Sequence, residues 1–210
     1  LLPPQANPES GKMEGEISQL DIENSLRFNN GLTLITLTRA QLKEVLEHAV
    51  AETAVGATPG QFAQLGGVAF SFDPNRPVGS RVITAGILHR RTGFPFFVLG
   101  GQVIGTEPER IVTLDFLANG GDGYPYPDFV AADPVFADRV DLNSQSLPAG
   151  NATFADPGTE QDALAEFLFA EHSTTPYRQR ETPEMLDLRL QNRLFRRDVI
   201  VNFVLRSVFF

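Results

Sequence analysis

Three short segments of this chain carry side chains that can hold a small ligand, and each segment is rich in turn-forming residues. Residues 26–31 place an aromatic ring and two amides just before an apolar run, and residues 58–67 form a glycine-rich connection. Residues 115–124 set a carboxylate and two aromatic rings beside a run of glycines. Aromatic rings stack on a base, amides bond to ring nitrogens, and a carboxylate accepts hydrogen bonds from ribose hydroxyls. In combination, these residue types suit a nucleoside.

Each segment also has a simpler interpretation, in which it only turns the chain. Residues 26–31 end in an Asn-Asn-Gly turn, and residues 58–67 can be a flexible entry to a strand. The Gly-Gly and Asp-Gly pairs within residues 115–124 are ordinary tight-turn dipeptides. Spacing alone leaves both interpretations open for each segment.

The sequence offers no self-contained catalytic or metal site. His48, His89 and His172 are isolated and lack the spacing of a metal site, so each is interpreted as a surface or packing residue. No serine lies in a Gly-x-Ser-x-Gly elbow, and the phosphate-binding Gly-x-x-x-x-Gly-Lys motif is missing. The absence of cysteine excludes thiol catalysis, disulfides and Cys-ligated metals. We therefore assign no catalytic residue and no metal ligand to this chain.

The composition is that of a globular domain with an acidic balance. The 210 residues are 42% hydrophobic, and 17 basic against 26 acidic residues give a formal net charge of −9. An acidic chain repels phosphate backbones, so nucleic-acid binding is disfavoured. No apolar run approaches the roughly 18 residues that identify a membrane-spanning helix, so we expect no membrane span.

The best-defined elements are a strand and the helix that follows it. Residues 32–37 mix β-branched and apolar residues over a strand length. Thr38 and Gln41 have the spacing of a capping box, in which each side chain bonds a backbone amide of the other residue. From Leu42 to Val50 the apolar residues recur at intervals of three and four. We therefore expect an amphipathic helix that packs against the core.

Further strands are expected at short apolar runs. Residues 68–72 alternate large and small side chains, and extended character resumes at residues 81–84 after a turn, which predicts a hairpin. Residues 94–99 and 111–116 are also short, apolar and bounded by glycine or proline, so they are predicted to be strands. A last strand is expected at residues 199–204.

A second helix is expected after Thr159, whose hydroxyl is a suitable cap. Its predicted buried face is formed by Leu164, Phe167 and Leu168. Strands and helices occur in irregular order, without regular β–α alternation. The predicted fold class is therefore α+β, with mixed sheets and two principal helices.

We divide the chain into a short linker and one domain. Residues 1–15 contain several prolines and glycines but few apolar residues, so they are interpreted as a linker. The chain begins as if cut within a loop, and we expect it to be part of a longer protein. Residues 16–210 are interpreted as a single domain, in which 142–158 and 173–198 are long surface connections.

At the three candidate segments the chain resembles the C-terminal domain of the 5'-nucleotidase and UDP-sugar hydrolase family, whose members are two-domain metallophosphoesterases. A Pro-Phe-Gly-Asn-like turn corresponds to residues 27–30, and a Gly-x-Phe-x-Gln-x-x-Gly stretch to residues 60–67. An Asp-Pro-x-x-Pro-x-Gly-x-Arg-Val hairpin spans residues 73–82. The strongest signature, Phe-Leu-Ala-x-Gly-Gly-Asp-Gly-Tyr, spans residues 116–124. In all, the resemblance covers about residues 16–130.

The resemblance implies a substrate-specificity domain that binds a nucleoside or nucleotide. By analogy with the family, Phe28 and Phe116 would sandwich the base and Asn30 would hydrogen-bond its ring. Gly60 would allow close approach of the backbone to the ligand, and Asp122 would hold a ribose hydroxyl.

The resemblance also implies that the chain works with a second domain. In the family, the pair of divalent metal ions and the catalytic histidine and aspartate belong to an N-terminal metallophosphatase domain, whose Asp-x-His and Gly-Asn-His-like motifs are absent here. We therefore expect no cofactor in this chain, no hydrolysis by the chain alone, and the N-terminal domain as its partner. The resemblance further implies a secreted, periplasmic or cell-surface location.

Two departures from the family pattern bear on the site. Members present a Gly-Gly-Gly-Ile-Arg segment whose arginine engages phosphate, and residues 6–15 of this chain read differently. Asn29 stands where glycine is common, which would reshape the pocket rim. The alternative function is a non-catalytic surface or interaction module with a vestigial pocket, and nucleoside binding would distinguish the two.

Overall fold

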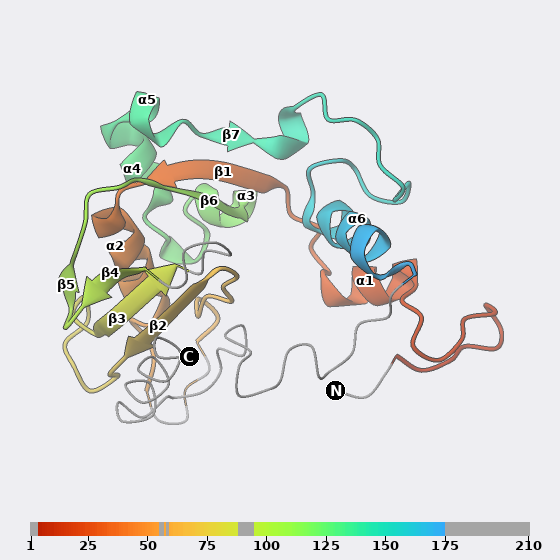
Figure 1. The fold of residues 1–210 in the computed structure, drawn as a ribbon, viewed down its shortest axis with the longest axis horizontal. Helices are drawn as coiled ribbons and strands as arrows, with labels where there is room; N and C mark the ends of the chain where they lie inside the picture. The colour runs from red at the N-terminus through yellow and green to blue at the C-terminus, as the bar shows by residue number, and fades with distance from the viewer. Residues whose placement is uncertain (1–3, 55–56, 58, 88–94, 175–210) are drawn as a thin grey trace.

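The described part of the chain forms two antiparallel sheets with helices around them (Figure 1). The computed structural model describes residues 4–54, 57, 59–87 and 95–174. Helices and antiparallel strands occur in mixed order along these residues, which confirms the α+β class. The strand predicted at 199–204 and most of the predicted connection at 173–198 lie outside the described residues.

The first sheet has the strand order β6-β1-β7. Candidate site residues lie directly before β1 and directly after β6. Strand β1 (Leu32–Leu37) lies in the middle and pairs antiparallel with β6 (Glu109–Leu114) and with the short β7 (Val140–Asp141). Every second residue of β1 is buried, as expected for a strand with one face on the core. The predicted strand at 32–37 is thus confirmed.

The second sheet has the order β2-β3-β4-β5. It consists of strands with the following bounds: β2 (Val68–Phe72), β3 (Val82–Ile87), β4 (Phe96–Leu99) and β5 (Gln102–Val103). Because β2 and β3 pair antiparallel around a turn of Asp, Pro, Asn and Gly residues, the predicted hairpin is confirmed.

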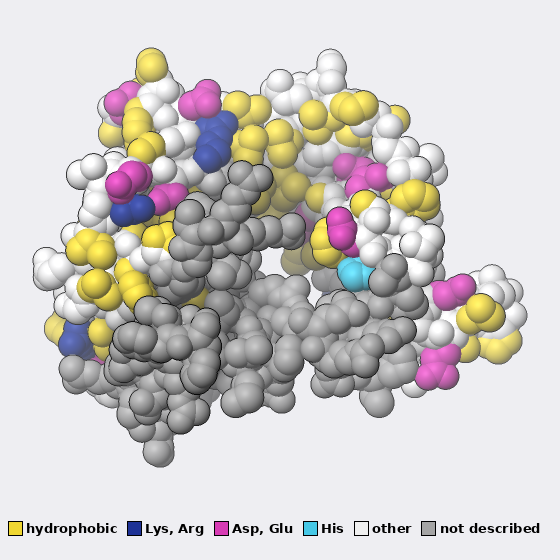
Figure 2. Space-filling model, in the orientation of Figure 1, with side chains coloured by type: hydrophobic (Ala, Val, Ile, Leu, Met, Phe, Trp, Pro, Cys, Tyr) yellow, Lys and Arg dark blue, Asp and Glu magenta, His cyan; other side chains and the backbone are white. Residues whose placement is uncertain are grey.

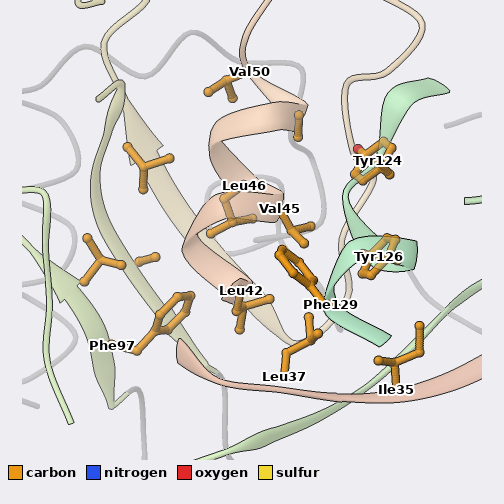
Figure 3. Packing of buried hydrophobic residues seen from close by; sticks show 14 of the residues in the cluster. Ile35, Leu37, Leu42, Val45, Leu46, Val50, Phe97, Tyr124, Tyr126 and Phe129 are labelled. Atoms are coloured by element: carbon orange, nitrogen blue, oxygen red, sulfur yellow. The ribbon is translucent and has the colours of Figure 1, made fainter. Parts of the chain in front are cut away.

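Helix α2 (Arg39–Ala49) packs between the two sheets and carries the central part of the core. Its capping box is formed as predicted, since Gln41 N donates to the Thr38 hydroxyl and Thr38 N donates to Gln41 Oε1. Figure 3 shows the helix side chains meeting residues of β1, of β4 and of the segment after residue 123. The labelled core residues are Ile35, Leu37, Leu42, Val45, Leu46, Val50, Phe97, Tyr124, Tyr126 and Phe129.

The end of α2 is fixed to the β2–β3 hairpin by hydrogen bonds between charged side chains and the backbone. The buried carboxylate of Glu47 accepts from the backbone amides of Arg81 and Val82, at 2.8 and 3.0 Å. The guanidinium of Arg81 in turn donates to the carbonyls of Val50 and Ala51, at 2.6 and 2.7 Å. These bonds satisfy carbonyls that a helix end leaves without partners. The last turn of α2 is therefore rigidly supported.

Helix α6 (Glu160–His172) begins at the predicted cap, because Thr159 Oγ1 accepts from the amide of Asp162. It lies beside α1 (Gln19–Ser25), a helix that was not predicted (Figure 1). The predicted buried face of α6 is confirmed only in part: Leu164 and Leu168 are half-buried, but Phe167 is 53% exposed and the polar Gln161 is buried. The reason is that Gln161 Nε2 donates to the carbonyl of Leu26, just after α1, which turns the polar side of the first helical turn inward.

A second correction concerns the strand predicted at 111–116. Strand β6 ends at Leu114, and Asp115 begins the short helix α3 (Asp115–Ala118). An acidic residue in the first turn favours a helix start, and the Asp115 amide donates to the carbonyl of Gly31 at 2.8 Å. Phe116 is consequently presented from a helix and not from a strand.

The chain then passes through short helices to the edge strand β7. A 3-10 turn at Gly121–Gly123 leads to α4 (Tyr126–Ala132) and α5 (Pro134–Ala137). After β7 a second 3-10 turn at Leu142–Ser144 opens the connection to α6. Figure 2 shows hydrophobic side chains in the recess between the α5 side of the molecule and this connection, with acidic side chains on both sides.

Candidate functional site

A polar pocket of about 670 Å³ opens where the chain before β1, the start of α3 and the chain before α6 meet. Residues 157–160 run antiparallel to residues 30–32, with Glu160 N donating to the Asn30 carbonyl at 2.9 Å and Leu32 N to the Gly158 carbonyl at 2.9 Å. We call this the amide pocket, and its lining consists of Phe28, Asn29, Asn30, Gly31, Asp115, Asn143, Gln145, Leu147, Asp156, Pro157 and Thr159.

The chemistry of the amide pocket favours a neutral or cationic group. Within the described part of the chain, its lining holds two carboxylates, several amides and no basic side chain. Carboxylates accept hydrogen bonds, and amides both donate and accept them. Such a lining suits hydroxyl and amine groups, and it repels a phosphate.

Gly31 allows two side chains of the pocket lining to approach the backbone closely. A Cβ at this position would lie 2.5 Å from Asn143 Nδ2 and 2.8 Å from Asp115 Oδ2, so no other residue fits without displacing these side chains. Asp115, Asn143 and Gly31 therefore approach one another because residue 31 has no side chain.

Phe28 and Asn30, both predicted to bind the base, line the amide pocket. Phe28 is 84% exposed, an unusual state for a large aromatic side chain. Asn29, between them, adopts a left-handed backbone with φ of 48°, which asparagine tolerates better than most residues. Asn30 donates from both its backbone N and its Nδ2 to Glu160 Oε1, at 2.8 and 3.0 Å. The side chain of Asn30 thus also anchors the pocket to α6.

Phe116 lies on α3, immediately after the pocket residue Asp115. Its ring is 49% exposed and rests against Gly121, where a Cβ would approach the ring carbons to 2.5 Å. The glycine therefore permits the ring to lie on the turn formed by residues 120–123, which we call the glycine turn. The structure thus places Phe116 against the glycine turn, whereas Phe28 lines the amide pocket, whose lining does not include Phe116.

Asp122 and Gly60 lie in a second group around the glycine turn. Asp122 is exposed and has a left-handed backbone, with φ of 52°. Gly60 is exposed, with no heavy atom within 4 Å of the position where its Cβ would be, so this loop has open space beside it. Tyr124 joins the two segments, because its hydroxyl donates to the carbonyl of Gln61 at 2.7 Å.

Burial dominates the electrostatics of the tyrosines behind the glycine turn. It raises the pKa of Tyr124 well above the usual range, and the neighbouring Tyr126 and Asp122 add to this effect. Burial likewise raises the pKa of Tyr126, whose ring stacks on that of Tyr124 with centroids 5.7 Å apart. Both hydroxyls therefore remain protonated at neutral pH and can serve as donors.

Sequence analysis did not identify several residues of these two groups as candidate site residues. Asn143, Gln145 and Asp156 come from an irregular connection that shows no periodic pattern. His48 is interpreted from the sequence as a surface or packing residue, yet its Nε2 lies 2.8 Å from the carbonyl oxygen of Asp122. The signal that could have found His48 is its position on the less apolar side of a core helix, close to the end of that helix.

The described residues do not form a metal site or a membrane-spanning helix. Among them, no group of three or more His, Cys, Asp or Glu side chains could hold a metal ion. No helix in these parts of the chain combines the length and hydropathy that crossing a bilayer requires.

The model of the family described as 5'-nucleotidase, C-terminal domain, matches residues 6–128. The chain belongs to this family. The resemblance seen in the sequence motifs is thereby confirmed, and all five predicted site residues fall within the matched segment. Residues between 143 and 159 form one wall of the amide pocket in this 5'-nucleotidase C-terminal domain. These residues lie outside the segment that the family model matches.

Curated relatives match the same part of the chain. The domain is 30% identical over 111 residues to Protein 5NUC of Lutzomyia longipalpis, which is 52% of this chain and 19% of that protein. It is 29% identical over 118 residues to the 5'-nucleotidase of Homo sapiens, covering 56% of this chain and 20% of that protein. The match thus spans about a fifth of the length of these relatives.

Two solved structures match part of the chain. The NAD nucleotidase of Haemophilus influenzae matches with a TM-score of 0.51 at 21% identity, over 61% of this chain and 22% of that chain. A 5'-nucleotidase precursor from Thermus thermophilus matches with a TM-score of 0.49 at 29% identity, over 61% of this chain and 23% of that chain. The first of these likenesses shows a shared fold for the matched part.

Proposed function

We propose that this domain binds the nucleoside part of a nucleotide and sets substrate specificity for a larger 5'-nucleotidase-type phosphoester hydrolase. The proposal is supported by the family match and by the chemistry of the two neighbouring groups of residues, the amide pocket and the glycine turn. In this proposal the phosphoester is cleaved by an N-terminal metallophosphatase domain, which is the partner of this chain.

The observation that carries the proposal is the position of Phe116. Its half-exposed ring rests on Gly121, and the preceding residue, Asp115, lines the same pocket as Phe28. An aromatic ring that is supported on one side by backbone and open to solvent on the other is a stacking surface for a base. Phe28 is the second proposed stacking surface, because a base would cover apolar area that is now 84% exposed.

The polar residues supply the other contacts that a nucleoside needs. Asn30 Nδ2 is engaged by Glu160, so the amide would read a donor of the base through its Oδ1. Asp122 is exposed and would accept hydrogen bonds from ribose hydroxyls. The open space beside Gly60 would allow the ligand to approach the backbone closely.

The absence of basic side chains from the described lining of the amide pocket supports a division of labour with the other domain. This chain would bind and orient the nucleoside, and orientation alone can account for several kcal/mol of a reaction barrier. The metal pair of the N-terminal domain would supply the activated hydroxide and the charge that the phosphate requires. The isolated chain would therefore bind nucleosides without hydrolysing nucleotides.

We further propose a location outside the cytoplasm for the parent protein. One relative is a venom 5'-nucleotidase of Macrovipera lebetinus, 27% identical over 110 residues. Fractionation of cells that produce the parent protein, with detection in the medium, periplasm or cell surface, tests this location.

The experiment that tests the proposed function is calorimetric titration of the 210-residue chain with adenosine and with AMP. Adenosine should bind about as well as AMP, and Phe116→Ala should abolish binding of both. The matched control is Phe169→Ala, which removes a similarly exposed ring, 54% accessible, from α6. If neither ligand binds to a chain that circular dichroism shows to be folded, the proposal fails and the interaction-module alternative takes its place.

A further inference from the structure

His48 lies in the last turn of α2 and reaches the glycine turn. Its Nε2 is 2.8 Å from the carbonyl oxygen of Asp122, 74 residues further along the chain. Because a carbonyl oxygen can only accept a hydrogen bond, His48 Nε2 must carry the hydrogen. The imidazole is therefore a donor to the backbone of the residue that we propose to bind ribose.

The glycine turn that receives this bond has an unusual backbone. Gly120, Asp122 and Gly123 all have positive φ, at 88°, 52° and 74°. Glycine adopts this conformation without cost, whereas aspartate adopts it less readily. The backbone conformation of Asp122 sets the direction of its Cα–Cβ bond, so a hydrogen bond to its carbonyl also restrains the region that the carboxylate can reach.

The ring of His48 also fills the space behind the turn. It contacts the ring of Tyr124 edge-on, with centroids 4.7 Å apart. A Cβ on Gly123 would lie 3.3 Å from His48 Cε1, so the turn packs directly against the imidazole. The turn is therefore restrained by packing on one side and by the hydrogen bond to Asp122.

The same histidine is linked to the loop that contains Gly60. Gln61 Nε2 donates to the carbonyl of His48 at 3.1 Å, and the Tyr124 hydroxyl donates to the carbonyl of Gln61 at 2.7 Å. His48, Gln61 and Tyr124 thus form a closed set of contacts between helix, loop and turn. The helix that carries the histidine is fixed in turn by Glu47 and Arg81.

We infer that His48 is a positioning residue of the nucleoside site. It acts through Asp122, by holding the glycine turn in the conformation that directs the carboxylate toward ribose hydroxyls. This inference rests on the proposed function, because it requires that Asp122 contacts the ligand. It assigns to His48 no direct contact with the ligand.

The test compares two ligands that differ only in the ribose hydroxyls, adenosine and 2',3'-dideoxyadenosine. Both are titrated calorimetrically into the 210-residue chain and into four variants: His48→Leu, His48→Gln, Asp122→Gly, and the double variant His48→Leu with Asp122→Gly. Glycine at position 122 removes the carboxylate and tolerates the left-handed backbone. Glutamine at position 48 keeps an amide donor near the place of the imidazole Nε2. Thermal unfolding by circular dichroism shows which variants remain folded.

We expect His48→Leu to weaken adenosine binding about tenfold, as loss of one well-placed hydrogen bond does, and to leave dideoxyadenosine binding within about twofold. His48→Gln should recover most of the adenosine affinity. In the double variant the effects of the two substitutions should not add, because both remove the same contact with ribose.

Other results would overturn the inference. If Asp122→Gly weakens adenosine binding while a folded His48→Leu variant does not, His48 does not position Asp122, although the proposed function stands. If His48→Leu weakens both ligands equally, the histidine supports the fold and not the ribose contact. If the wild-type chain binds adenosine and dideoxyadenosine with equal affinity, and Asp122→Gly does not change adenosine binding, the proposed role of Asp122 fails together with the inference.

Discussion

Asn30 and Glu160 are 130 residues apart in sequence and are joined by two hydrogen bonds to a single carboxylate oxygen. The backbone N and the Nδ2 of Asn30 donate to Glu160 Oε1 at 2.8 and 3.0 Å. One partner is a predicted base-binding residue, and the other opens helix α6. The site is therefore connected to a helix that lies beyond the segment matched by the family.

Removal of this carboxylate should destabilise the domain and loosen the site. Glu160→Ala leaves two part-buried donors of Asn30 without their acceptor, so we expect a loss of about 1–2 kcal/mol in the free energy of unfolding. Urea denaturation measures the effect. The control is Glu171→Ala, an exposed position near the end of the same helix, where the change should stay within about 0.5 kcal/mol. Equal effects at both positions would contradict the assigned role of Glu160.

Gly121→Ala should displace the ring of Phe116. The added methyl group would lie 2.5 Å from ring carbons, which real contacts do not allow, so the ring must move. We expect a loss of about 1–3 kcal/mol in stability and loss of adenosine binding. The matched control is Gly66→Ala, because a Cβ at Gly66 has nothing within 4 Å. Unchanged adenosine binding in Gly121→Ala would mean that the orientation of Phe116 does not matter for the ligand.

Phe28→Ala should separate binding from stability. Since the side chain is 84% exposed, its removal should change the free energy of unfolding by no more than about 0.5 kcal/mol. Adenosine binding should weaken by about 1–3 kcal/mol, the usual contribution of one stacking contact. Calorimetry and urea denaturation of the same preparation measure both quantities. A large loss of stability would show that Phe28 packs in the core instead.

The thermal and chemical stability of the domain should fall in acid partly because of Asp141. Burial alone would raise the pKa of this carboxyl, but hydrogen bonds from Thr33 and Arg139 outweigh burial and lower it. A carboxyl whose pKa is lower in the folded state stabilises the fold at pH values above its pKa in the unfolded state, about 3.9. This contribution is lost as the pH falls through its pKa in the folded state. Urea denaturation across the acid range should therefore show a shallower pH dependence for Asp141→Asn than for the wild type. Parallel curves would assign the acid dependence to other carboxyls.

At the alkaline end, Tyr124 should make stability depend on pH in the opposite direction. Its pKa is raised by burial first, and then by Tyr126 and Asp122. The folded state thus favours the neutral phenol. Its contribution to stability is fully present at pH values below the pKa of an unfolded tyrosine, about 10, and is lost as the pH rises toward the pKa in the folded state. Tyr124→Phe should remove part of this loss, measured by urea denaturation and by the ultraviolet absorbance of tyrosinate. An unchanged alkaline profile would place the effect elsewhere.

The parts of the fold that were predicted correctly depend on local signals. The strand at 32–37, the capping box of Thr38 and Gln41, and the hairpin around residues 73–80 need only neighbouring residues to specify them. The two errors arose where distant contacts decide. Strand β6 gives way to a helix at Asp115, where the amide makes its last bond across to the carbonyl of Gly31. In α6, Gln161 faces inward because its side chain donates to the carbonyl of Leu26.

The site was predicted only in part for the same reason. Phe28 and Phe116 occur in recognisable motifs, so their types and positions could be read from the sequence. His48 is interpreted only as a surface or packing residue because its partner, Asp122, is 74 residues away in the sequence. Asn143 and Gln145 belong to an irregular connection, and nothing in such a segment indicates that it folds back beside Gly31.

The pairing of Gly31 with Thr159 also has a consequence for the order of folding. Contacts between residues close in sequence, such as those within α2, can form early, whereas a contact that closes a loop of more than 100 residues carries a larger entropic cost and forms late. During synthesis the amide pocket cannot close until residues near 160 have emerged from the ribosome. The core cluster around α2, whose buried members within the described residues all precede position 138, can assemble before that. The amide pocket thus matures after the core, and a nascent chain that stops short of α6 would have a core without this pocket.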